Sequence, residues 1–173
     1  MKVKPVSALL GCLLLAGCDQ PPPVRAVPAE PLTDINIRQA FTCRYETLPE
    51  PAAEADVLFK YARWLQVNNR LQDDKSVDTE VGRLYRIAAE NAHTKATINL
   101  LNGSLRGRFG LTGGERLRFA QQLIKAKVAS GYYFIAIYLQ YGAAGLKQDD
   151  GMALRYYRKA ADEGNPQAQA YVG

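Results

Sequence analysis

The chain has 173 residues, with 22 lysines and arginines against 17 aspartates and glutamates, giving a formal net charge of +5. Hydrophobic residues make up 47% and charged residues 23%, a balance typical of globular proteins that excludes wholesale disorder and collagen-like or disulfide-rich designs. The length predicts one folded domain. With one histidine and three cysteines, the chain has few residues that could ligate a metal ion or form a Cys–His or Ser–His catalytic site.

The first residues have the pattern of a secretory signal peptide. Lys2 and Lys4 supply a positive start, and residues 6–16 form an apolar core that is too short for a permanent membrane span. Residues 15–18, Leu-Ala-Gly-Cys, resemble the lipobox of bacterial lipoproteins. That resemblance implies removal of residues 1–17, lipidation of Cys18, and a periplasmic protein anchored by lipid to the cell envelope membrane. The alternative is an ordinary signal peptide with an incidental cysteine.

Removal of the signal peptide leaves 20 basic and 17 acidic residues, a net charge of +3. No basic run accompanies this mild excess, so we do not expect nucleic acid as a partner.

The remaining cysteines are Cys18 and Cys43, and lipidation of the first leaves the second without a disulfide partner. For Cys43 we favour a small buried apolar side chain over a reactive thiol.

Residues 18–33 are expected to form a tether. Five of the twelve residues from Gln20 to Pro31 are proline, which favours an extended, semi-rigid chain that advances roughly 3 Å per residue. The segment from Leu32 to Tyr45 is ambiguous between a short helix and an extended chain. The folded domain is assigned to residues 34–173.

From Glu54 onward the apolar residues follow helical spacing, and no period-two alternation is long enough to form a sheet. The pattern therefore predicts an all-α fold, with a glycine-rich loop over residues 103–114. Helices are expected from about residue 54, over residues 115–129 and 132–141, from Asp149 or Asp150 to Glu163, and from Asn165-Pro166 onward.

The chain contains an internal repeat. Residues 83–96 and 155–168 are identical at six of fourteen positions, and the offset of 72 corresponds to two periods of about 36. Residues 122–131 are the expected middle copy, with Gly131 matched to Gly164. Small alanines would let paired helices approach closely, and about three stacked pairs are needed to bury their apolar faces.

Residues 145–168 resemble a Sel-1-like repeat, a relative of the tetratricopeptide repeat. The resemblance rests on Gly145-Leu146, on Asp149, and on the run Tyr-Tyr-Arg-Lys-Ala-Ala at residues 156–161 followed by Gly164. It implies a right-handed α-solenoid of helix–turn–helix repeats with a concave face. About three repeats are expected within residues 34–173, the last of them incomplete.

Most of the chain after residue 17 is also similar to a set of pseudomonad Sel-1-like repeat lipoproteins. The similarity lies in residues 18–23, 32–45 and 131–133 and in the last repeat. Those proteins resemble immunity proteins for phospholipase D effectors of type VI secretion. The resemblance implies a protein that binds a secreted phospholipase toxin in the periplasm and blocks it. Because relatives continue through further repeats, this chain is expected to be a shortened copy.

Several polar features have plain structural interpretations. His93 aligns with Asn165 at a turn between helices, and no second catalytic group accompanies it. The pairs Asp73-Asp74 and Asp149-Asp150 precede helices and are expected to cap them rather than bind metal. The glycine-rich loop lacks the Gly-Lys-Ser/Thr of a phosphate loop. We therefore expect no catalytic residues, no metal and no cofactor.

Five aromatic residues are the candidate contacts with a protein partner, because tyrosine and tryptophan often dominate protein interfaces. They lie on the expected first helices of the repeats, and core packing is the alternative for each of them: Tyr61, Trp64, Tyr132, Tyr133 and Tyr141. Four other tyrosines recur at equivalent positions and are expected in the core: Tyr85, Tyr138, Tyr157 and Tyr171. Four arginines are expected on a solvated helix face: Arg83, Arg86, Arg155 and Arg158.

Two other classes of function remain open at this point. A general envelope scaffold could use the same repeats to assemble a membrane protein complex. An envelope hydrolase is disfavoured because the sequence shows no catalytic constellation.

Overall fold

The computed structural model describes residues 44–173, which belong to one compact unit, Phe41–Gly173. The expected signal peptide, the lipidated Cys18, the tether over residues 18–33 and Cys43 lie outside the described residues. Within residues 44–173 the regular structure consists of seven α-helices and contains no strand, which confirms the predicted all-α class.

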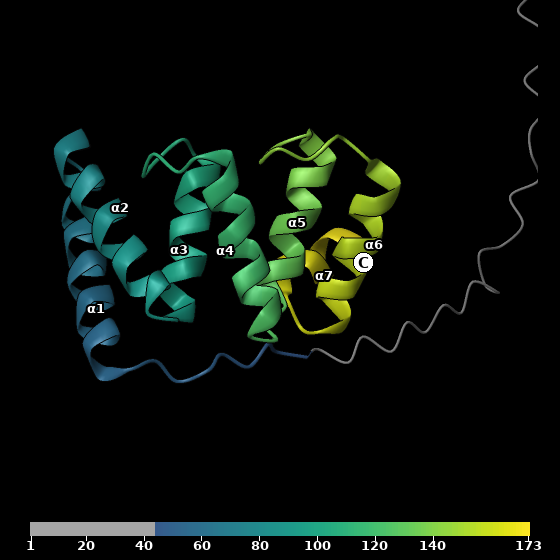
Figure 1. Cartoon of the computed structure of the whole chain (residues 1–173), viewed down its shortest axis with the longest axis horizontal. Coiled ribbons are helices and arrows are strands. Elements are labelled where there is room, and N and C mark those ends of the chain that lie inside the picture. Colours follow the sequence, from purple (N-terminus) through teal and green to yellow (C-terminus); the bar gives the residue numbers. More distant parts are fainter. Residues whose placement is uncertain (1–43) are drawn as a thin grey trace, which may run out of the picture. The chain divides into compact units, whose positions relative to one another are not determined.

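The helices follow one another along the chain, and the most extensive contacts join consecutive helices (Figure 1). Helix α1 lies at one end of the row and packs on α2, which packs on α3, and so on to α7. The helices are α1 (Ala53–Asn68), α2 (Lys75–Glu90), α3 (Thr94–Leu105), α4 (Gly113–Lys125), α5 (Ser130–Tyr141), α6 (Asp150–Asp162) and α7 (Pro166–Val172).

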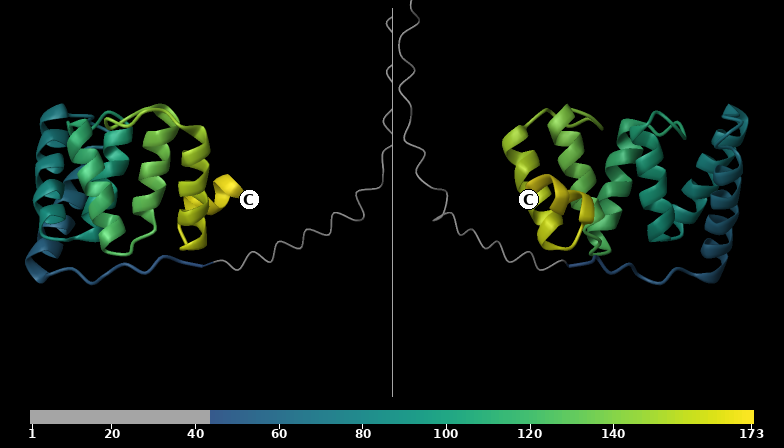
Figure 2. Two further views of the ribbon diagram at one scale, coloured as in Figure 1. Left: turned by 45° about the vertical axis from the view of Figure 1, so that its right-hand side comes forward. Right: turned by 180° about the vertical axis from the view of Figure 1, so that it is seen from behind.

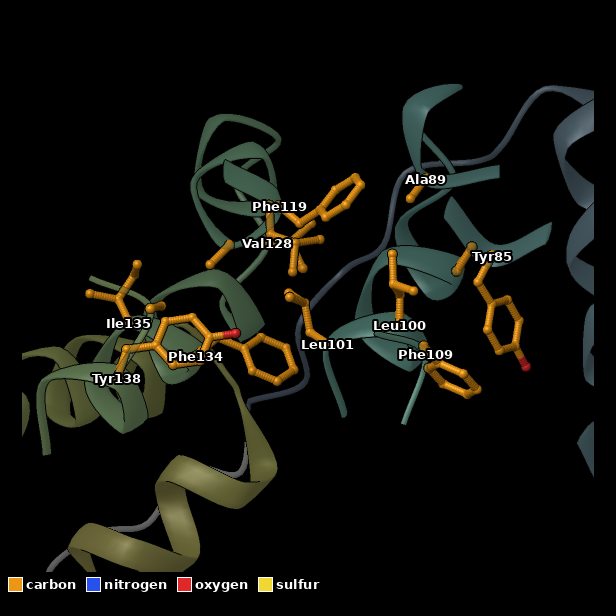
Figure 3. Close-up of a cluster of buried hydrophobic side chains, with 14 of the residues drawn as sticks. Tyr85, Ala89, Leu100, Leu101, Phe109, Phe119, Val128, Phe134, Ile135 and Tyr138 are labelled. Atoms are coloured by element: carbon orange, nitrogen blue, oxygen red, sulfur yellow. The ribbon is translucent and has the colours of Figure 1, made fainter. Parts of the chain in front are cut away.

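The core runs through the row of helices and combines small residues with large ones (Figure 3). Buried alanines allow close approach of the helix backbones, and aromatic and aliphatic side chains fill the remaining space. Tyr85 and Tyr138 are fully buried, as expected from the repeat. Eight alanines are completely inaccessible to solvent: Ala62, Ala88, Ala89, Ala96, Ala120, Ala136, Ala160 and Ala168.

The two strongest copies of the repeat share the same helix starts. His93 is the N-cap of α3, and its Nδ1 accepts a hydrogen bond from the backbone N–H of Ala96 (3.1 Å). Asn165 is the N-cap of α7, and its Oδ1 accepts from the N–H of Ala168 (2.8 Å). Both side chains are buried. The expectation that His93 and Asn165 occupy equivalent turns is confirmed.

The tautomer of His93 follows from this arrangement. Because Nδ1 accepts a hydrogen bond, Nε2 carries the proton and donates to Asp56 of α1 at 3.3 Å. The pKa of Asp56 is lowered from its ordinary value, chiefly by the hydrogen bond from Lys60 and then by the one from His93. His93 thus caps α3 and also ties α3 to α1.

Helices α2, α4 and α6 have side-chain caps as well. Asp74 accepts from Ser76 N–H, and Asp149 accepts from Met152 N–H, which confirms the capping role predicted for one member of each acidic pair. Thr112 and Glu115 form a complete capping box at the start of α4. Each of the three helices therefore begins with a satisfied backbone donor.

The expected middle copy was misaligned. Gly131 lies inside α5, and Lys127 is the residue that shares a positive φ (59°) with Ala92 (59°) and Gly164 (97°) at the end of the preceding helix. Helix α4 accordingly ends at Lys125 rather than at residue 129. Gly131 is needed for packing instead, because a Cβ there would lie 2.8 Å from the carbonyl oxygen of Ala120 on α4.

The predicted glycine loop is shorter than expected. Gly103 lies within α3, and Gly113 and Gly114 begin α4, so the loop covers residues 106–112.

Phe109 in this loop has a positive φ of 68° and is buried between α2 and α3. A Cβ at Gly103 would overlap the Phe109 ring, and one at Gly82 would lie 2.8 Å from Phe109 Cβ. These two glycines make the space that Phe109 occupies.

Substitution Gly103→Ala should lower the free energy of unfolding by about 1–3 kcal/mol, because the added methyl overpacks against Phe109. Gly114→Ala is the matched control, since a Cβ there meets nothing within 4 Å and alanine favours the helix. Urea denaturation would measure both. Equal stability of the two variants would contradict the assigned packing of Phe109.

Substitution His93→Ala should lower the free energy of unfolding by about 1–2 kcal/mol, because Ala96 N–H loses its cap. His93→Asn should cost clearly less, because asparagine makes the equivalent cap at the start of α7. Thermal unfolding of the two variants would check this order, and the reverse order would refute the equivalence of the two turns.

Candidate protein-binding surfaces

The five predicted contact residues lie in three separate places. Tyr61 and Trp64 are on α1, where their side chains are exposed and their rings stack with centroids 6.1 Å apart. The spacing of three residues puts both rings on one side of the helix. They form an aromatic pair on α1, and this helix lies at one end of the row (Figure 1).

Tyr132 is half-buried and differs from this pair. Its ring centroid lies 6.2 Å from that of Tyr156 on α6, and the Lys159 ammonium lies 5.8 Å from the centre of the Tyr132 ring. The side chain also lines a groove that includes Tyr45 and Lys127. Part of its surface is thus used for packing between α5 and α6.

Tyr133 and Tyr141 belong to a cluster with Tyr157 and Tyr171. The Tyr133 and Tyr157 rings meet edge to face at 5.9 Å, and the Tyr157 and Tyr171 rings stack at 4.0 Å. Burial raises the pKa of Tyr157 and, less strongly, of Tyr133, with their tyrosine neighbours adding to both shifts. We call these four residues the C-terminal tyrosine cluster.

Two members of the cluster are open to solvent. Tyr141 is 72% exposed and Tyr171 is 53% exposed. The expectation that Tyr171 lies in the core is therefore wrong, because its ring stacks on Tyr157 while half of its surface stays accessible. Tyr157 itself is buried as predicted.

A glutamine positions the cluster, and sequence reasoning missed it. Gln140 accepts a hydrogen bond from the Tyr157 hydroxyl (2.7 Å) and donates to the Tyr171 hydroxyl (3.2 Å). At the other end of the row, Gln66 accepts from the Tyr85 hydroxyl at 2.8 Å. The sequence does contain a signal, an aromatic residue followed by Leu-Gln at residues 64–66 and again at residues 138–140. Gln66 precedes Tyr85 by 19 positions, and Gln140 precedes Tyr157 by 17.

The predicted arginine face is only partly a solvated face. Arg83 is exposed and pairs with Glu80 through two hydrogen bonds within α2. Arg86 is half-buried, and its Nε donates to Glu115 of α4 at 3.0 Å. Arg155 and Arg158 are exposed on α6, as expected. Arg86 thus ties two non-consecutive helices together instead of facing solvent alone.

An extended segment, residues 44–52, runs along one edge of the helices to the start of α1 (Figure 2). The Glu46 carboxylate accepts from the backbone N–H of Ser130 (2.7 Å) and from its hydroxyl (2.6 Å). Glu46 N–H donates to Gly164 O (3.2 Å), and Gln169 donates to Arg44 O (3.1 Å). We call this segment the strap.

The strap supplies the cap that α5 lacks. Ala129, the residue before α5, makes no side-chain cap, whereas α3 and α7 are capped by His93 and Asn165. A carboxylate at a helix N-terminus also interacts favourably with the helix dipole. Glu46 therefore caps α5 from a segment far away in the chain, as His93 caps α3 and Asn165 caps α7.

Substitution Glu46→Ala should lower the free energy of unfolding by about 1–3 kcal/mol, because Ser130 loses a charged acceptor for two hydrogen bonds. Glu50→Ala is the control, since Glu50 is an exposed glutamate on the same strap. Chemical denaturation would compare the two, and a similar loss for both would argue against the capping role.

Other features of the described residues bear on function. Within residues 44–173 no group of three or more histidine, cysteine, aspartate and glutamate side chains could hold a metal ion. In the same part of the chain no helix is long and apolar enough to cross a membrane. Comparisons with protein-family models, with curated proteins and with solved structures gave no match to this chain.

Proposed function

We propose that this chain is a lipid-anchored periplasmic protein-binding module, an immunity protein that binds and blocks a type VI-secreted phospholipase effector. The exposed aromatic side chains on α1, α5 and α7 carry the proposal, with Tyr61, Trp64, Tyr141 and Tyr171 all more than half exposed. Large aromatic side chains held rigidly at a surface are typical anchors of protein interfaces.

The proposed architecture is a right-handed α-solenoid of Sel-1-like repeats. Its support is the packing of each helix on the next and the equivalent caps His93 and Asn165, 72 residues apart. The hydrogen bonds from Tyr85 to Gln66 and from Tyr157 to Gln140 add a second repeated contact. In a solenoid each repeat contacts its neighbours and the repeats together present an extended surface.

The proposed mechanism is steric occlusion by binding, with no chemistry from this chain. The Gln140 side chain holds the rings of Tyr157 and Tyr171 in place before any partner arrives, so little side-chain entropy is lost on association. Lipidation at Cys18, which follows from the lipobox, would hold the binding surface at the membrane where a phospholipase acts.

Co-expression in the periplasm tests the proposal. Cells that produce a type VI-secreted phospholipase encoded beside this chain should survive when they also produce this chain. Substitution Tyr141→Glu, at an exposed tyrosine, should weaken binding to that effector by tenfold or more. Met152→Glu is the control, because Met152 is an exposed apolar residue in the first turn of α6, where an acidic side chain is tolerated.

Survival counts and a purified binding assay would be read together. Failure of the well-folded chain both to bind the effector and to protect the cells would refute the immunity function. Recovery of several envelope proteins on this chain, with no effector, would support the scaffold alternative in its place.

A further inference from the structure

The polar contacts around Tyr85 and around Tyr157 are built alike. Gln66 on α1 accepts a hydrogen bond from the Tyr85 hydroxyl of α2 at 2.8 Å, and Gln140 on α5 accepts one from the Tyr157 hydroxyl of α6 at 2.7 Å. The side-chain oxygen of a glutamine can accept two hydrogen bonds. The two sites can therefore be compared by the group that uses the second acceptor position of each glutamine.

At the first site that position is used by a guanidinium of the chain itself. Arg63 lies three residues before Gln66 on α1, and its Nη1 donates to Gln66 Oε1 at 3.2 Å. Asn99 of α3 donates to the Tyr85 hydroxyl at 3.4 Å. A cation and an amide from within the chain thus complete the hydrogen bonding at the first site.

The second site has no such cation. The residue three positions before Gln140 is Ile137, whose side chain has no hydrogen-bond donor. Within residues 44–173 the bond from Tyr157 is the only hydrogen bond that Gln140 Oε1 accepts. Gln140 therefore keeps an unused acceptor position on the side of α5 where α1 carries its guanidinium.

Tyrosine rings border this unused acceptor. Tyr141 is mostly exposed and neighbours Ile137 on the surface of α5, four residues away. Tyr171 is half exposed, and its hydroxyl accepts from Gln140 at 3.2 Å. The cation–ring contacts found within residues 44–173 lie outside the C-terminal tyrosine cluster. Because the faces of aromatic rings attract cations, these rings and the glutamine oxygen favour a positive ligand.

The pKa values of the two buried hydroxyls reflect the same difference. Burial raises the pKa of Tyr85 and the pKa of Tyr157. At Tyr85 the hydrogen bond from Asn99 and the charge of Arg63 oppose this rise, whereas at Tyr157 the other tyrosines of the cluster add to it. A nearby positive charge favours the ionised phenol, so the surroundings of Tyr157 lack the cation that Tyr85 has.

We propose that the C-terminal tyrosine cluster binds an arginine side chain of the protein partner, whose guanidinium donates to Gln140 Oε1 and packs against the Tyr141 and Tyr171 rings. The bound guanidinium takes the place beside Gln140 that Arg63 has beside Gln66. The inference rests on the proposed function in taking a protein as the partner. It adds the chemical group that the partner presents to this surface.

A guanidinium suits both parts of the site. It is planar and stacks on aromatic rings, and its five N–H groups leave an edge free to donate to an oxygen. A quaternary ammonium, such as the choline of a lipid headgroup, attracts rings but has no donor. It would leave the second acceptor position of Gln140 unused, so the site should prefer arginine.

A peptide titration tests the proposal. The probe is acetyl-Gly-Arg-Gly-amide, added to the full chain with ¹³C-labelled tyrosine rings and followed by NMR. The Tyr141 and Tyr171 signals should shift saturably, with a dissociation constant on the order of 1–10 mM for this single side chain. The same peptide with citrulline in place of arginine is the control, because it has a similar shape without the charge. It should bind about fivefold more weakly or less tightly still.

Substitutions on α5 should move the affinity in opposite directions. Gln140→Glu should tighten binding by about fivefold or more, because a carboxylate keeps the bond from Tyr157 and adds a charge to the bond with the guanidinium. Tyr141→Leu should weaken binding by about threefold or more, because the ring is lost while an apolar side chain remains. Tyr61→Leu is the matched control, since Tyr61 is an exposed tyrosine on α1, and it should leave the affinity unchanged.

A glutamate at position 141 does not replace the ring in this way. Its carboxylate would be solvated, with no hydroxyl to hold it as Tyr157 holds residue 140, and exposed ion pairs contribute little.

Four results would overturn the proposal. Tyrosine signals that stay unchanged up to about 100 mM peptide would show that the cluster does not bind arginine. Equal binding of the citrulline peptide would remove the role of the charge, and tighter binding of choline would assign the cluster to a lipid headgroup. Shifts that grow with protein concentration in the absence of peptide would assign it to a second copy of this chain. None of these measurements involves the effector, so the arginine site and the immunity function fail separately.

Discussion

The fold depends on close approach between consecutive helices, which small residues at the contacts permit. Ala62, Ala88, Ala96, Ala120 and Ala136 have no solvent exposure, and Gly131 brings α5 onto the backbone of α4. At such separations one added methyl group disturbs the packing of the two helices, because protein interiors are packed as densely as organic crystals. Every surface discussed above follows from this spacing, since it determines which side of each helix is covered and which remains open.

Polar contacts then fix the angle and register of helices that small residues alone would let slide. His93 joins α3 to Asp56 of α1, and Arg86 joins α2 to Glu115 of α4. The ion pair of Arg86 with Glu115 is half-buried, and the His93 ring donates an N–H hydrogen bond to Asp56, so both contacts bridge separate helices. We expect such contacts to favour one arrangement of the helices, which keeps the aromatic side chains of a binding surface in place.

The sequence allowed good prediction where the signal was local. The cap at Asp149, the Asn165-Pro166 start of α7 and the all-α class were all evident, because capping and helical periodicity act over a few residues. The middle repeat was misaligned because Gly131 looked like a helix-ending glycine. It is a glycine for another reason, the nearness of α4, and that contact is visible only in three dimensions.

The candidate surface was harder to predict for the same reason. In the sequence Tyr171 recurs at a position equivalent to Tyr85 and Tyr157, yet Tyr171 is exposed and the other two are buried. Exposure depends on whether another helix lies alongside, which no residue pattern within the helix reports. The link from Glu46 to Ser130 spans 84 positions and leaves no local trace.

The strap has a consequence for the order of folding. Contacts between consecutive helices close short loops, whereas the bonds from Glu46 to Ser130 and from Gln169 to Arg44 span 84 and 125 positions. Long-range closure costs more chain entropy, so we expect the helix row to form first and the strap to pack on it afterwards. Interactions absent from the transition state act on the unfolding rate. We therefore expect loss of the strap contacts to raise the unfolding rate of the helix row and to change its folding rate little.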